Sequence, residues 1–196
     1  MNTKVYITII TITMLSASPV SLSQIIKENA IQSIDEFKGN QDPSKLSGSY
    51  SAIGRDKSLP EETRAELYVR ILIRASEYLE SHPKPAGTPM LNVPPPDGGI
   101  PGEDPAGIKD PIARAKYERD IAANKSLAEA CIKHRTLLDL QHSIMTYCIS
   151  FRRIKPENDK LLATYIQKQT TDPLAIKKVT DLINKEEANK TQQDNR

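Results

Sequence analysis

The chain has 196 residues, of which 27 are basic and 25 acidic, so its formal net charge is +2. This near balance argues against an electrostatic nucleic-acid binder, which would carry a basic face or run. Aromatic residues make up 5% of the chain and tryptophan is absent. We therefore expect a modest aliphatic core built from about 100 to 130 residues.

The N-terminus predicts a cleaved signal peptide over residues 1–23. Lys4 supplies a basic start, a mostly apolar or β-branched run follows to Leu15, and small residues precede a cleavage site after Ser23. The apolar run is too short to cross a bilayer core of about 30 Å, so we expect no stable membrane span in the mature chain. The alternative is a buried N-terminal strand, because Ile and Thr alternate over residues 7–13. The signal predicts a periplasmic or secreted protein.

The region 24–82 is predicted to hold two helices joined by a polar loop. An amphipathic stripe indicates a first helix over residues 24–38. Ser-Gly and Asp-Pro pairs indicate a loop over residues 40–57. Residues 58–61 have the Ser-x-x-Glu pattern of a capping box, which predicts a second helix that ends near His82, before a proline.

A Pro/Gly-rich stretch separates these helices from the rest of the chain. Residues 83–111 hold nine of the fourteen prolines and five of the eight glycines. Such a composition is typical of a linker, so we expect residues 83–110 to act as a spacer, extended near the triple proline at 94–96. The alternative is a ligand for a polyproline-binding partner.

The central stretch from Asp110 to Pro156 contains both cysteines. Its Asp110-Pro111 pair is a helix-start signature, and a single helix continuing to the next proline would be about 65 Å long. The apolar residues of its first and second halves point in directions that differ by roughly 130° on a helical wheel. Because a helix packed on one core keeps one buried face, we expect a break near residues 137–142 and an antiparallel αα-hairpin.

The hairpin would place Cys131 opposite Cys148, which predicts a disulfide that stabilises the fold by about 3 kcal/mol. Two buried free thiols are the alternative. Cys131, His134, His142 and Cys148 together also supply ligand types that zinc prefers, although their spacing matches no recognised finger pattern. We therefore keep zinc only as an alternative and expect no cofactor.

Two further helices complete a C-terminal helical domain over residues 111–187. Pro156 and the Asp172-Pro173 pair mark their starts, and the polar residues 188–196 are expected to form a disordered tail. The predicted fold is therefore all-α: a small helical bundle built on an αα-hairpin. Asn124 and Asn189 each begin a glycosylation acceptor triplet.

One segment carries a family resemblance. The run Asp-Pro-x-x-Arg-x-x-Tyr-Glu-x-x-Ile-x-x-Asn, from Asp110 to Asn124, resembles a group of uncharacterised exported bacterial proteins. In that group a Pro/Gly-rich stretch also precedes a Tyr-Glu helix, and smaller helices follow. The resemblance covers residues 100–187 and implies no activity, so no residue inherits a role from it.

Possible acid–base residues lie on the central stretch, but charged residues at helical spacing are typical of a solvated face. They are Glu118, Asp120, Glu129, His134 and Asp139. The sequence favours a non-catalytic exported helical protein that mediates protein–protein interaction or self-assembly, with another protein or a second copy as partner. The alternative is a small periplasmic hydrolase or zinc-dependent enzyme using His134 and His142. An envelope spacer set by residues 83–110 is a third hypothesis.

Overall fold

A computed structural model describes residues 22–37, 42–90, 93–94 and 104–194. Within these ranges the chain is all-α, as predicted. The α-helices and the 3₁₀ turn of these ranges are α1 (Leu22–Asp35), α2 (Ser44–Arg55), α3 (Glu61–Ser81), η1 (Pro105–Gly107), α4 (Pro111–Ile154), α5 (Glu157–Gln169) and α6 (Pro173–Asp194). Residues 1–21 of the predicted signal peptide lie outside the described part of the chain, and its last two residues belong to α1. Among the residues described, no helix combines the length and apolarity needed to cross a membrane.

Four Asp-Pro pairs each stand at the start of a helix. The carboxylates of Asp42, Asp104, Asp110 and Asp172 accept a hydrogen bond from the backbone N–H two residues later, at 2.9–3.0 Å. This contact satisfies one of the free N–H groups at a helix start, and proline supplies a compatible φ angle. The prediction of a loop over residues 40–57 is therefore wrong for residues 44–55, because Asp42-Pro43 starts α2 there.

The predicted capping box at the start of α3 does not form. The Ser58 N–H and hydroxyl both donate to Asp56 Oδ1, at 2.9 and 2.6 Å, and α3 begins only at Glu61. Glu61 is engaged elsewhere, since its Oε1 accepts a 2.6 Å hydrogen bond from the Tyr147 hydroxyl of α4. The serine thus closes a turn with Asp56 in place of capping the helix.

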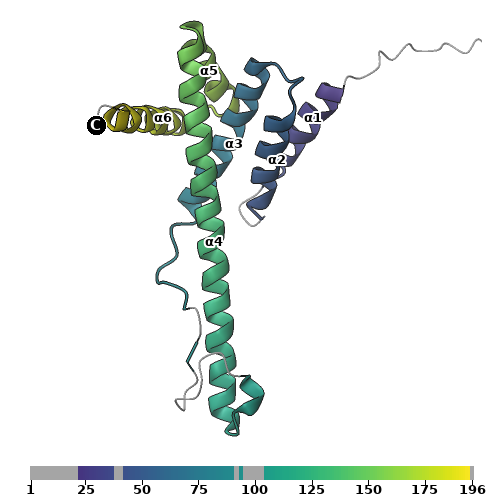
Figure 1. The fold of residues 1–196 in the computed structure, drawn as a ribbon, viewed down its shortest axis with the longest axis vertical. Helices are drawn as coiled ribbons and strands as arrows, with labels where there is room; N and C mark the ends of the chain where they lie inside the picture. Colours follow the sequence, from purple (N-terminus) through teal and green to yellow (C-terminus); the bar gives the residue numbers. More distant parts are fainter. Residues whose placement is uncertain (1–21, 38–41, 91–92, 95–103, 195–196) are drawn as a thin grey trace, which may run out of the picture.

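The central stretch is one unbroken helix. α4 runs for 44 residues from Pro111 to Ile154, without a turn near residues 137–142. The predicted αα-hairpin is therefore wrong. Figure 1 shows the helix as the longest of the described elements, with its C-terminal half among the other helices and its N-terminal half projecting from them.

The change of apolar face along α4 has a different cause from a break. In the C-terminal half, side chains such as Leu137, Ile144 and Phe151 are buried in the core of the bundle. In the N-terminal half, Tyr117 is 1% exposed although it lies outside that core cluster. The helix presents two faces because its two halves pack against different parts of the chain.

We call residues 111–136 of α4 the arm; it is about 39 Å long. Residues 82–90, 93–94 and 104–110, which we call the strap, pack along it and connect α3 to its tip (Figure 1). The expected spacer over 83–110 is thus, in its described parts, bound to α4.

The helices before and after the strap share one hydrophobic core. It includes Ile34 of α1, Leu72 of α3, Leu162 of α5 and Ile183 of α6. The final helix continues to Asp194, so the prediction of a disordered tail is wrong for residues 188–194. Residues 195–196 lie outside the described part of the chain.

Candidate interaction surface

The two cysteines do not pair. Cys131 is half-buried on the arm, Cys148 is buried in the bundle, and both are free thiols. Seventeen helical residues separate their Cα atoms by about 25 Å, whereas a disulfide requires about 7 Å or less. The predicted Cys131–Cys148 disulfide is therefore wrong. Burial raises the pKa of the Cys148 thiol to about 12, so this group behaves as a small apolar side chain.

The proposed zinc ligands do not converge either. Cys131, His134, His142 and Cys148 lie along the same continuous helix, so its two end residues cannot share an ion. His142 Nδ1 instead lies 3.2 Å from Glu186 Oε1 of α6. In the described ranges, no group of three or more His, Cys, Asp or Glu side chains is arranged to hold a metal.

His134 faces a groove at the base of the arm. This groove, of about 420 Å³, lies between the end of α3, the first residues of the strap and α4, and it is also lined by His82, Glu129 and Lys133. His82 is held by contacts of its ring with Tyr78 and of its Nδ1 with Ser81. His134 therefore lies in the groove and His142 lies beside α6, so the two histidines do not share one site.

The arm holds the strap through hydrogen bonds to the strap's main chain. The Asn124 side-chain amide donates to the Met90 carbonyl at 3.0 Å, and its oxygen accepts from the Met90 N–H at 2.8 Å. The buried Tyr117 hydroxyl donates to the Val93 carbonyl at 3.0 Å. A glycan on Asn124, the first residue of an acceptor triplet, would remove the amide from this pairing.

The strap is also held near the tip of the arm. The Arg114 guanidinium donates to the Ile108 carbonyl at 2.6 and 3.0 Å, and more weakly to the Ala106 carbonyl at 3.4 Å. The Ile108 side chain is itself buried. The strap is therefore fixed along the arm at three places, and in each place the arm contacts the strap's backbone.

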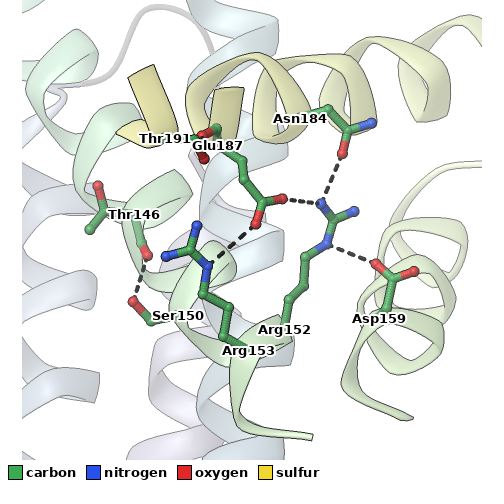
Figure 2. Close-up of polar contacts among 8 residues, drawn as sticks. All are labelled: Thr146, Ser150, Arg152, Arg153, Asp159, Asn184, Glu187 and Thr191. Atoms are coloured by element: carbon green, nitrogen blue, oxygen red, sulfur yellow. Dashed lines mark hydrogen bonds and ion pairs between the residues drawn. The ribbon is translucent and has the colours of Figure 1, made fainter. Parts of the chain in front are cut away.

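A second polar cluster fixes the last two helices to the bundle. Figure 2 shows Arg152 of α4 between Asp159 of α5 and two residues of α6, Asn184 and Glu187. The Arg152 side chain is only 18% exposed, while its neighbour Arg153 reaches the same Glu187 from a more exposed position. Because the Arg152 guanidinium contacts both α5 and α6, this cluster holds the two helices together against α4.

Aromatic rings of α2 and α3 pack against Tyr147 of α4 in tilted and edge-to-face arrangements. Tyr68 of α3 lies between Tyr50 and Tyr147, with ring centroids 4.8 and 4.7 Å away. Burial raises the pKa of Tyr68 to about 12. Burial, followed by the hydrogen bond to Glu61, also raises the pKa of Tyr147. Both hydroxyls therefore remain protonated at any physiological pH.

No protein-family model, curated protein or solved structure matches this chain. The arm and its strap are therefore characterised by their own contacts. Sequence reasoning missed the roles of Asn124, Arg114 and Arg152. Tyr117 was recognisable as part of an apolar stripe, but its partner lies 24 residues earlier in a segment that resembled a spacer.

Proposed function

We propose that this protein is a non-catalytic exported helical protein whose arm binds another protein or a second copy of the chain, in the cell envelope or outside the cell. The projection of the arm from the bundle is the observation that carries this proposal (Figure 1). A helix that leaves its own core offers a partner a long and accessible surface.

The exposed apolar side chains of the arm support the same proposal. Ile112 and Ile132 on the arm are 78% and 65% exposed, and Met90 on the strap is 60% exposed. Large apolar side chains cost free energy in contact with water, and a partner that covered them would gain by their burial. The proposal of export rests on the N-terminal sequence pattern alone, because the cysteines form no disulfide that would indicate an oxidising compartment.

Charge substitutions on the arm test the proposal. Tagged wild-type protein and an Ile112→Lys/Ile132→Lys variant would be purified from the cells that make the protein, and their bound proteins compared by quantitative mass spectrometry. Sedimentation velocity would measure self-association of the same samples. We expect the variant to lose the partner or the dimer. Leu174→Lys, at an exposed site on α6, is the matched control. Equal recovery from all three proteins would exclude Ile112 and Ile132 from the binding surface and refute the proposal as it is stated for them.

A further inference from the structure

The arm contacts the strap in the way that proteins recognise an extended peptide. Asn124 pairs with both the N–H and the carbonyl of Met90, so a single side chain satisfies the donor and the acceptor of one backbone residue. Tyr117 and Arg114 add hydrogen bonds to the carbonyls of Val93 and Ile108. Since these groups are present in every peptide, the hydrogen bonds do not require the covalent connection between strap and arm.

The strap also shows which segments would fit. At Met90 the bound residue must have an N–H, so proline is excluded there. Gly87 has φ +98°, a backbone conformation that favours glycine. A side chain at this position would contact Leu127 of the arm, because its Cβ would lie 3.6 Å from Leu127 Cδ2. Prolines at 85, 89 and 94 surround these positions and restrict the backbone, which lowers the entropy lost on binding.

We propose that the arm is a receptor for an extended, proline-containing peptide segment, that the strap occupies this receptor within the same chain, and that a partner's segment of the same chemistry takes its place. This inference rests on the proposed function and names the chemistry of the partner. A tethered segment competes at an effective concentration of order millimolar, so the strap keeps the receptor closed against weak ligands.

A synthetic peptide provides a direct test. A fluorescent peptide with the sequence of residues 84–94 would be titrated with the full chain, and its anisotropy measured. In a Met90→Pro variant the strap loses one hydrogen-bond donor while the arm is unchanged. We expect this variant to bind the peptide about tenfold more tightly than wild type, which corresponds to the loss of one hydrogen bond from the competing strap.

A second substitution separates specific binding from nonspecific adhesion. Met90→Pro/Asn124→Ala removes the amide that holds the peptide backbone, and we expect it to abolish saturable binding. Met90→Pro/Lys125→Ala changes an exposed neighbour and is expected to bind like Met90→Pro. Circular dichroism would establish that each variant keeps its helix content. Absence of saturable binding to Met90→Pro up to millimolar protein, or binding that survives Asn124→Ala, would overturn the inference.

The test is independent of the one that examines the proposed function. The peptide assay depends on Asn124, whereas the partner assay depends on the exposed Ile112 and Ile132. If the isoleucine variant loses its partner but no peptide binds, the arm is an interaction surface of another kind. If the peptide binds but no partner depends on the isoleucines, the receptor stands and the proposed function fails at those residues.

Discussion

A proline at position 139 distinguishes a continuous α4 from a hairpin. Asp139 lies in the interior of α4, with an exposed side chain that pairs with Arg135 at 3.0 Å. Asp139→Pro removes a backbone hydrogen bond within the helix and introduces a clash with the preceding turn, at a cost of about 3 kcal/mol or more. Asp139→Ala loses an exposed ion pair of about 0.3–0.5 kcal/mol and gains a similar amount in helix propensity. We therefore expect the alanine variant to be nearly neutral.

Thermal unfolding followed by circular dichroism measures this difference. In a chain of this length, a change of 1 kcal/mol shifts the melting temperature by about 2–4 °C, so Asp139→Pro should melt about 6–12 °C below Asp139→Ala. A turn near residue 139 would accept proline with little loss of stability. A proline variant within about 1 kcal/mol of the alanine variant in urea unfolding would refute the continuous helix.

Three further results are expected. Denatured, unreduced protein should contain two free thiols. In the folded protein, alkylation should reach half-buried Cys131 well before Cys148, because burial raises the pKa of Cys148 to about 12. Two cysteines that resist labelling until a reductant is added would contradict this expectation. Arg152→Ala should lower the free energy of unfolding in urea by about 1–2 kcal/mol and Arg153→Ala by less than about 0.5 kcal/mol, because Arg152 is less exposed and contacts both α5 and α6. Equal losses in the two variants would show that Arg152 does not hold these helices together. The pKa of Tyr68 is about 10 in the unfolded chain and is raised to about 12 by burial in the folded protein. The free energy of unfolding should therefore fall as the pH rises from 10 through 12, and it should fall less steeply in Tyr68→Phe. Identical pH profiles of the two proteins would exclude a contribution of Tyr68.

The helical class and most helix starts could be predicted because they depend on local chemistry. Asp110-Pro111 and Asp172-Pro173 start helices as predicted, through a carboxylate that bonds an N–H two residues away. The same rule applied to Asp42-Pro43 predicts α2, but the sequence interpretation took this pair, together with the Ser-Gly residues that follow, as the mark of a loop. Gly48 is tolerated in that helix because α2 buries Leu46 and Ile53 against the core.

The hairpin could not be judged from local patterns. The wheel correctly indicated two buried directions on residues 111–154, but a change of buried face arises from a turn or from a second packing partner. The choice depends on whether residues 83–110 lie free or return along the helix, and prolines alone do not show this. The hydrogen bonds of Asn124 and Arg114 decide it, and their partners are main-chain atoms that leave no mark in the sequence. The disulfide prediction failed with the hairpin because it depended on the same turn.

The arm and the strap explain each other's stability. Most of the stability of a helix in a protein comes from the packing of one face, and Tyr117 is the only arm residue in the described chain that is fully buried. The strap supplies that packing, since the Tyr117 hydroxyl bonds to Val93. Displacing the strap without replacement would therefore expose Tyr117 and weaken the arm. A partner segment must provide equivalent backbone groups at the same positions, so binding and arm stability should rise and fall together in Asn124 variants.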